Sequence, residues 1–230
     1  MVSEITILSS NGVRGILNEL GPAFERRSEQ RLAVQFDAAA ILRQRIENGA
    51  AFDVAILTAP IADDLIKAGK LVTATRADIA RSGVGMAVRM GAPKPDISTP
   101  EAFKGALLAA QSVAYTTQGA SGQYFASLLE KLGVADRVRA KARTMPSGVT
   151  GELVATGEAE LAVQQISELM TAPGVELVGP LPPELQSYTM FTAAVGASAS
   201  EPEAATAFIK FLTAPEALPA IWASGMILPG

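Results

Sequence analysis

Residues 5–15 read Ile5-Thr6-Ile7-Leu8-Ser9-Ser10-Asn11-Gly12-Val13-Arg14-Gly15. The β-branched residues predict a strand, and the two hydroxyls, the amide and the glycine predict a turn into a helix near residues 12–26. The first N–H groups of a helix have no partner inside the helix, so they are available to bind an anion. This stretch therefore predicts an anion site where a strand meets a helix.

The same order of strand, turn and helix is repeated twice between residues 31 and 69. Residues 31–36 and 52–57 are apolar and strand-sized, Asp37 stands at an N-cap position, and Pro60 fits the first turn of the third helix. Three such units joined by short loops imply a parallel sheet with helices on both faces.

A second series of strands and helices follows residues 81–97, which combine glycine-spaced apolar residues with a proline-rich loop. It is predicted to contain strands at 112–115, near 142 and at 161–165, and helices at 99–109, up to 132 and from Val149. A long strand over Met190–Val195, a helix at 202–213 and a short helix to about Ser224 complete the prediction. The predicted class is α/β.

Composition excludes several kinds of function. The net charge is −4 and the pI is about 5.0, so no basic surface is expected to bind nucleic acid. The chain has no cysteine and no histidine, which excludes disulfides, thiolate or imidazole metal sites and Ser-His or Cys-His nucleophile pairs. We expect no metal and no cofactor, and any general base would be a carboxylate, a tyrosine, a lysine or a water held by one of them.

Several motifs occur in a fixed order along almost the whole chain. They are Ile7-Leu8-Ser9-Ser10-Asn11-Gly12, Phe36-Asp37-Ala38-Ala39-Ala40, Leu42-Arg43-Gln44-Arg45-Ile46-Glu47-Asn48-Gly49-Ala50, Asp53-Val54-Ala55-Ile56, Gly122-Gln123-Tyr124 and Gly148-Val149-Thr150. In this order they resemble the type II periplasmic binding proteins, the solute-capturing components of ABC importers, and most closely the molybdate-binding branch.

The resemblance implies a two-lobed fold, each lobe a mixed, mostly parallel sheet flanked by helices, with two crossing strands as a hinge. The first lobe would comprise residues 1–81 and 197–230, the second residues 90–188, and the crossing strands residues 82–89 and 189–196. It also implies that helix N-termini and loop hydroxyls hold a ligand in the cleft between the lobes.

Some positions differ from the molybdate-binding pattern. The branch has a serine hydroxyl where this chain has Gly12, serines where it has Ala38-Ala39-Ala40, and a tyrosine where it has Gln165. Each lost donor to a buried anion costs about 1.5–3 kcal/mol. The differences favour an organic carboxylate over molybdate or tungstate as the ligand.

The candidate ligand-binding residues lie at the predicted helix starts, at the strand ends and at the entry to the first crossing strand. They are Ser9, Ser10, Asn11, Gly12, Arg14, Ala38, Ala39, Arg81, Ser82, Ser121, Gly122, Ser147, Gly148, Val149, Gln164 and Gln165.

Several of these residues have an alternative structural interpretation. The serines and the asparagine before residue 12 could cap the first helix, and Arg14 could point into solvent. Arg81 and Ser82 could be an ordinary polar entry to a strand, Ser147 and Gly148 could be a turn, and the two glutamines could contact a loop.

Two hypotheses about function remain open. The first is a solute-binding protein of an ABC importer, not an enzyme, that captures a small anion. The second is an enzyme on the same scaffold, because aconitate isomerase resembles this branch. It would catalyse a cofactor-independent 1,3-proton shift on a tricarboxylate. Arg14 and Arg81 would be clamps, and Asp37, Tyr115 or Ser121 would be the base.

A third interpretation is the effector-sensing domain of a transcription regulator, which shares the fold; no helix-turn-helix segment is found before Ile5.

The expected partners of the chain are a small anionic ligand and an ABC permease, and the expected state is a monomer. The location is predicted to be the periplasm if a leader was removed, and otherwise the cytoplasm.

Overall fold

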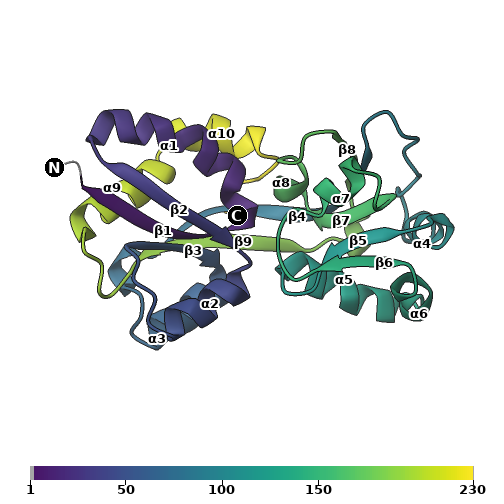
Figure 1. The fold of residues 1–230 in the computed structure, drawn as a ribbon, viewed down its shortest axis with the longest axis horizontal. Helices are drawn as coiled ribbons and strands as arrows, with labels where there is room; N and C mark the ends of the chain where they lie inside the picture. Colours follow the sequence, from purple (N-terminus) through teal and green to yellow (C-terminus); the bar gives the residue numbers. More distant parts are fainter. Residues whose placement is uncertain (1–2, 230) are drawn as a thin grey trace. The chain divides into compact units, whose positions relative to one another are not determined.

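A computed structural model describes residues 3–229, and its contacts divide the chain into two compact units. Unit 1 comprises the chain up to Arg81 and from Thr189 onward, and unit 2 comprises Ser82–Tyr188. In both units helices pack on a sheet (Figure 1). The predicted α/β class, with mostly parallel strands flanked by helices, is confirmed. The assignment of residues 82–89 and 189–196 to a hinge stays a prediction.

Unit 1 contains a mixed sheet with the strand order β2-β1-β3-β9. The strands are β1 (Glu4–Ser10), β2 (Arg31–Asp37), β3 (Val54–Thr58) and β9 (Tyr188–Val195). The first three are parallel, with Ser10 paired to Asp37 and Ser9 to Ile56, while β9 is antiparallel to β3. The carboxyl ends of β1, β2 and β3 therefore meet at one edge of the sheet.

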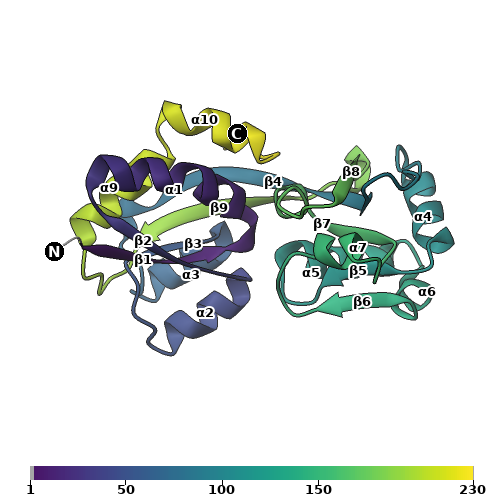
Figure 2. The same cartoon turned by 45° about the horizontal axis from the view of Figure 1, so that its top comes forward.

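Helices cover both faces of the unit 1 sheet (Figure 2). One face carries α1 (Arg14–Ser28), α9 (Pro202–Leu212) and α10 (Leu218–Ala223). The other face carries α2 (Ala39–Glu47) and α3 (Ala59–Lys67). Unit 1 also contains the short 3-10 helices η1 (Asn11–Val13), η2 (Thr73–Thr75) and η4 (Pro215–Ala217). Successive strand residues point to opposite faces. Ile7 accordingly packs with Phe24 and Phe208, whereas Leu8 packs with Leu42.

Unit 2 contains the strand order β4-β7-β5-β6, with β8 also paired to β4. The strands are β4 (Ala77–Arg89, which begins in unit 1), β5 (Val113–Thr116), β6 (Ala142–Met145), β7 (Leu161–Gln165) and β8 (Val175–Pro180). Strand β5 is parallel to both β6 and β7, and β4 is antiparallel to β7 and β8. The carboxyl ends of β5, β6 and β7 therefore share one edge.

Two layers of helices also enclose the sheet of unit 2. Helices α4 (Pro100–Ala109), α5 (Ala120–Lys131) and α6 (Ala135–Arg139) contribute Phe103, Phe125 and Val138 to the core on one face. Helices α7 (Gly151–Ala155) and α8 (Ile166–Leu169) contribute Val154 and Leu169 to the core on the other face. A short 3-10 helix, η3, spans Pro183–Leu185. None of the helices within residues 3–229 combines the length and apolar character that a membrane crossing requires.

Some details of the predicted secondary structure were wrong. Strand β4 begins at Ala77, so Arg81 and Ser82 lie within it rather than before it, and the helix predicted from Val149 begins at Gly151. Strand β8 and helix α6 were not predicted. Both are short, and each depends on packing against distant parts of unit 2 rather than on its own hydrophobic pattern.

A buried carboxylate ties together distant segments of unit 1. Asp53, just before β3, accepts hydrogen bonds from Thr6 N (2.8 Å), Ser200 N (2.7 Å), Ser200 Oγ (2.9 Å) and Glu201 N (3.1 Å). Burial raises the pKa of Asp53, but the hydrogen bonds from Thr6, Glu201 and Ser200 outweigh it, so the net pKa lies below its ordinary value. Asp53, the first residue of the Asp53-Val54-Ala55-Ile56 motif, therefore has a structural role.

Candidate functional site

The carboxyl edge of the unit 1 sheet brings three helix starts together. Strand β1 leads into η1 and α1, β2 into α2, and β3 into α3. The residues at the N-caps of η1, α2 and α3 are Ser10, Ala38 and Thr58, and none makes a side-chain capping hydrogen bond. The N–H groups of these first turns are therefore not used by cap side chains, which suits the binding of an anion.

The hydroxyl of Ser10 is buried at this edge and has no hydrogen-bond partner among the described residues. The neighbouring Ser9 Oγ donates to Ser10 O at 3.2 Å. The capping interpretation of these serines was therefore wrong, because neither side chain caps the helix. Leaving a buried hydroxyl unpaired costs about 1–3 kcal/mol, so such a group is a ready donor to a ligand.

Arg14, the first residue of α1, is half-buried at the same edge. Its Cζ lies 4.0 Å from the centroid of the Phe36 ring, and its Nη2 donates to Asn11 Oδ1 at 3.0 Å. Its Nε is buried without a hydrogen-bond partner, and no carboxylate of residues 3–229 forms an ion pair with it. The interpretation that Arg14 points freely into solvent was wrong, and its charge lacks a counter-ion within the described chain.

Asp37 pairs directly with Ser10 where β2 runs parallel to β1. It was predicted to be the N-cap of the second helix, but it is the last residue of β2, and Ala38 occupies the N-cap. Its Oδ1 accepts a hydrogen bond from Ala38 N at 2.8 Å. Ala38 and Ala39 are buried and offer no side-chain donor. The role of Asp37 as a general base stays a prediction.

A Ser10→Ala variant separates ligand binding from folding. We expect the ligand-free protein to keep its unfolding free energy or gain up to about 1 kcal/mol, because an unpaired buried hydroxyl is removed. The stabilisation by a bound anion should fall by about 1.5 kcal/mol. Thermal denaturation with and without molybdate, sulfate or tricarboxylates measures both changes.

Ser28→Ala is the matched control at the other end of α1, where the hydroxyl already donates to Phe24 O at 2.8 Å. It should lower the stability of the ligand-free protein by about 1 kcal/mol and leave the response to anions unchanged. Equal responses of the two variants to anions would contradict a ligand role for Ser10.

The carboxyl edge of the unit 2 sheet carries a second set of polar side chains. Helix α5 begins next to Thr116, and a Cβ on Gly122 would lie 1.7 Å from Thr116 O, so only glycine allows this approach. Ser121 is buried beside it, and Thr116 Oγ1 is buried without a hydrogen-bond partner in the described part of the chain. Ser121 and Gly122 therefore lie at the predicted helix start, and their ligand contacts stay a prediction.

Gln164 holds the loop that follows β6. Its Oε1 accepts hydrogen bonds from Thr150 N (2.8 Å) and Thr150 Oγ1 (2.7 Å), and its Nε2 donates to Gly148 O at 2.8 Å. Gly148 has a φ of +112°, a conformation that favours glycine. This agrees with the loop-contact alternative for Gln164; direct ligand contacts by Gln164, Ser147, Gly148 and Val149 stay predictions.

The end of β7 and the start of α8 place further buried polar groups beside β4. Ser82 Oγ accepts a hydrogen bond from Ser167 N at 3.2 Å, and Val84 pairs with Gln165. Gln165 Oε1 and Ser167 Oγ are buried with no partner among the described residues. Ser167 and Thr116 were missed by the sequence analysis, although both are polar residues next to a strand end, which is the signal that selected Gln165.

Tyr115 and Tyr124 both lie in unit 2. Tyr115 is buried in the core, with its ring centroid 5.2 Å from that of Phe125, and Tyr124 Oη donates to Leu185 O at 2.9 Å. Burial raises the pKa of Tyr124. The role of Tyr115 as a base stays a prediction, as does the clamp role of Arg81, whose backbone pairs with Ile227.

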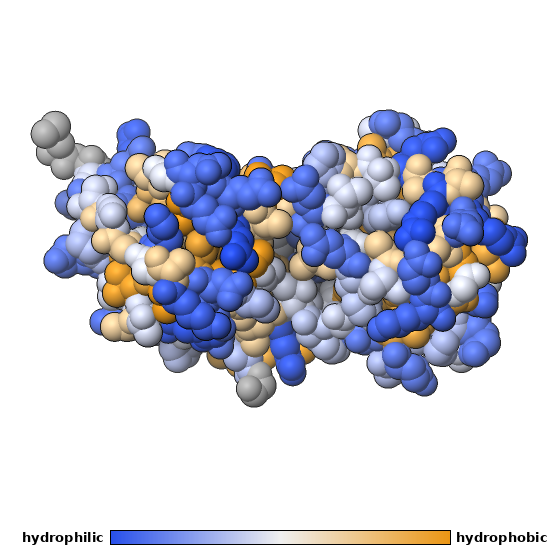
Figure 3. All heavy atoms as spheres, turned by 90° about the horizontal axis from the view of Figure 1, so that it is seen from below, coloured by the Kyte–Doolittle hydropathy of each residue, from blue (hydrophilic) through white to orange (hydrophobic). Residues whose placement is uncertain are grey.

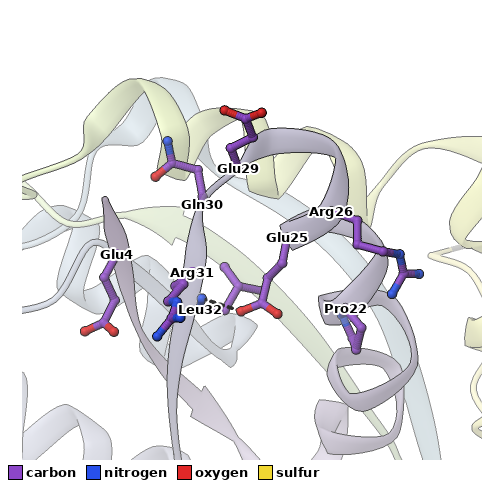
Figure 4. Close-up of a pocket in the computed structure, with 8 residues that line it drawn as sticks. All are labelled: Glu4, Pro22, Glu25, Arg26, Glu29, Gln30, Arg31 and Leu32. Carbon is purple, nitrogen blue, oxygen red and sulfur yellow. Dashed lines mark hydrogen bonds between the residues drawn. The ribbon is translucent and has the colours of Figure 1, made fainter. Parts of the chain in front are cut away.

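A separate hollow of about 790 Å³ lies at the opposite end of the unit 1 sheet (Figure 4). Its charged residues are Glu4, Glu25, Glu29, Arg26 and Arg31, so acidic groups outnumber basic ones. Glu25 Oε1 is occupied by a hydrogen bond from Leu32 N at 2.8 Å. On the face shown in Figure 3, apolar residues are scattered among hydrophilic ones. Neither feature has the helix starts and buried polar side chains that are found at the carboxyl edges.

Comparisons with known proteins agree with this architecture. A family model described as bacterial extracellular solute-binding protein matches residues 5–227. The chain is 37% identical over 231 residues to the aconitate isomerase of a Pseudomonas species, with 98% of this chain and 88% of that protein covered.

Two solved structures have a similar fold. The periplasmic molybdate-binding protein of Azotobacter vinelandii has a TM-score of 0.84 at 18% identity and covers 98% of this chain and 100% of its own. The sulfate-binding protein SubI of Mycobacterium tuberculosis has a TM-score of 0.75 at 18% identity and covers 97% of this chain and 86% of its own. At this identity the likeness concerns the fold alone. Because the family model spans nearly the whole chain, the protein belongs to the bacterial extracellular solute-binding proteins, and its type II periplasmic fold is similar to that of the molybdate-binding protein.

Proposed function

We propose that this protein binds aconitate at the carboxyl edge of unit 1 and interconverts its trans and cis isomers. The observation that carries the proposal is Arg14, a half-buried cation that forms no ion pair within residues 3–229. It lies at the sheet edge where three helices start, and the N-cap side chains there make no capping hydrogen bond. The 37% identity to an aconitate isomerase over 98% of the chain supports a polycarboxylate rather than a metal oxyanion.

The reaction is a 1,3-proton shift. A base removes a proton from the methylene carbon of aconitate, and the electron pair of that C–H bond forms the new C=C bond. The electrons of the old double bond take up a proton at the far allylic carbon. No atom or electron is gained or lost overall, so the reaction needs binding groups for carboxylates and one proton-carrying group.

The proposal assigns the roles within unit 1 to neighbouring residues. Arg14 and the N–H groups at the starts of α1, α2 and α3 hold carboxylates and stabilise the negative charge that develops when the proton leaves. Asp37 carries the proton, because it is the carboxylate in register with Ser10. Tyr115 is less suited to this role, since its side chain packs in the core against Phe125.

Turnover of trans-aconitate by the purified protein tests the proposal. We expect ¹H NMR in D₂O to show cis-aconitate forming and deuterium entering the allylic carbons. Asp37→Asn should lower kcat by about 100-fold or more, since general base catalysis contributes roughly 10²–10⁴-fold. Asp64→Asn, which changes an exposed carboxylate on α3, is the control and should not alter kcat. Absence of both cis-aconitate and deuterium uptake would refute catalysis.

A second candidate function is supported by the family itself. The match of residues 5–227 to the solute-binding family favours capture of a small organic carboxylate for an ABC permease without chemistry. In that case trans-aconitate or another tricarboxylate would bind unchanged. A ligand at 100 times its Kd should stabilise the protein by about 2.7 kcal/mol. Thermal denaturation with tricarboxylates, dicarboxylates, molybdate, tungstate and sulfate distinguishes carboxylate binding from metal oxyanion binding.

A further inference from the structure

We infer that Phe36 is a positioning residue that holds the Arg14 guanidinium ready to bind a carboxylate of the substrate. The inference rests on the proposed function, since it concerns the same edge of unit 1. Phe36 belongs to none of the residues predicted to bind ligand, and it acts through Arg14 rather than by touching the substrate.

The contact between the two side chains joins β2 to α1. Phe36 is the next-to-last residue of β2 and Arg14 is the first residue of α1, and the Arg14 Cζ lies 4.0 Å from the ring centroid. Phe36 is half-buried and packs against the core that contains Val13 and Ile16. The core therefore fixes the ring, and the ring attracts the guanidinium through its negative face.

A second contact fixes another part of the guanidinium. Asn11 Oδ1 accepts a hydrogen bond from Arg14 Nη2 at 3.0 Å, while Arg14 Nε has no hydrogen-bond partner among residues 3–229. An arginine side chain has many rotamers and loses this freedom when a ligand fixes it. Because Phe36 and Asn11 already restrict Arg14, little of this freedom remains to be lost when a carboxylate binds.

Phe36→Leu tests the inference in the full-length protein. We expect the Kd or KM for trans-aconitate to rise about 3- to 30-fold, the fold-change that corresponds to a partly desolvated cation–π contact. Phe36→Tyr keeps an aromatic face and should restore the wild-type value within about 2-fold. Since a positioning residue acts through Arg14, Phe36→Leu should change the Kd by less than about 2-fold in an Arg14→Ala background.

Phe211→Leu is the matched control. The Phe211 ring lies 5.5 Å from Cζ of Arg27, which is in the last turn of α1, away from the carboxyl edge. This variant loses the same kind of side chain from the same core, so its melting temperature should fall as much as that of Phe36→Leu. Its Kd for trans-aconitate should equal the wild-type value.

A measurement on the ligand-free protein separates failure of this inference from failure of the proposed function. Phe36→Leu should broaden the Nε–H NMR signal of Arg14, while Phe211→Leu should leave it unchanged. An unchanged signal, or an equal rise in Kd with and without Arg14, would overturn the inference. If the wild-type protein neither binds nor converts trans-aconitate while the signal broadens, the proposed function fails and the positioning of Arg14 stands.

Discussion

Replacing Arg14 by alanine is expected to lower kcat/KM for trans-aconitate by about 100-fold, or about 2.7 kcal/mol. Arg14 lies at the sheet edge of unit 1 where three helices start without side-chain capping bonds, and it forms no ion pair within residues 3–229. In the proposed site a substrate carboxylate becomes its counter-ion. Steady-state kinetics measure the loss of activity, and calorimetry with trans-aconitate measures the loss of binding.

Two further variants define what Arg14 contributes. Arg14→Lys keeps the charge but loses the planar fork that binds a carboxylate through two hydrogen bonds, so its kcat/KM should lie between the values of the wild type and Arg14→Ala. Arg27→Ala removes an exposed arginine from the last turn of the same helix and should leave kcat/KM unchanged. Wild-type kinetics of Arg14→Ala would contradict the proposed site.

The second large effect concerns stability. Asp53→Ala is expected to lower the free energy of unfolding by about 3–5 kcal/mol, because it removes the buried acceptor of four part-buried hydrogen bonds from Thr6, Ser200 and Glu201. Asp96→Asn is the control: Asp96 accepts a hydrogen bond from Ser98 N at 2.9 Å in an exposed loop, and its replacement should cost less than about 0.5 kcal/mol. Urea denaturation measures both changes.

The effect of Asp53 should depend on pH. The pKa of Asp53 in the folded protein lies below its ordinary value of about 3.9. A group with a lowered pKa stabilises the fold fully above its unfolded pKa, and this contribution is lost as the pH falls through the folded pKa. The stability difference between the wild type and Asp53→Asn should therefore be constant above about pH 5 and shrink below pH 4. A difference that does not change with pH would contradict this account.

The local elements of unit 1 could be predicted well from the sequence. Strands β1, β2 and β3 carry continuous or alternating apolar residues, and each is followed by a helix within one residue, so pattern and propensity agree. The short elements β8 and α6 could not be found in this way, because long-range packing stabilises them.

The candidate site was predicted only in part. A serine or a glutamine at a strand end signals a polar edge, which identified Ser10 and Gln165. The sequence could not indicate that Gln164 holds the loop at Thr150, that Asp37 precedes the N-cap, or that Phe36 lies under Arg14. Such roles depend on side-chain direction and on register between strands far apart in the chain.

The sequence by itself determined the α/β class, because hydrophobic periodicity fixes strands and helices. It also predicted where polar residues gather, because they stand at the helix starts, where backbone N–H groups lack partners inside the helix. Only the tertiary structure decided which polar and charged side chains have partners within the described residues and which remain available to a ligand. It paired Asp53 with the donors of Thr6, Ser200 and Glu201, and it left Arg14, held by Phe36 and Asn11, without an ion-pair partner among the residues that the structure describes. The reason is physical: whether a polar group has a partner depends on distances between segments that are remote in the chain, and these distances are set when the cores pack.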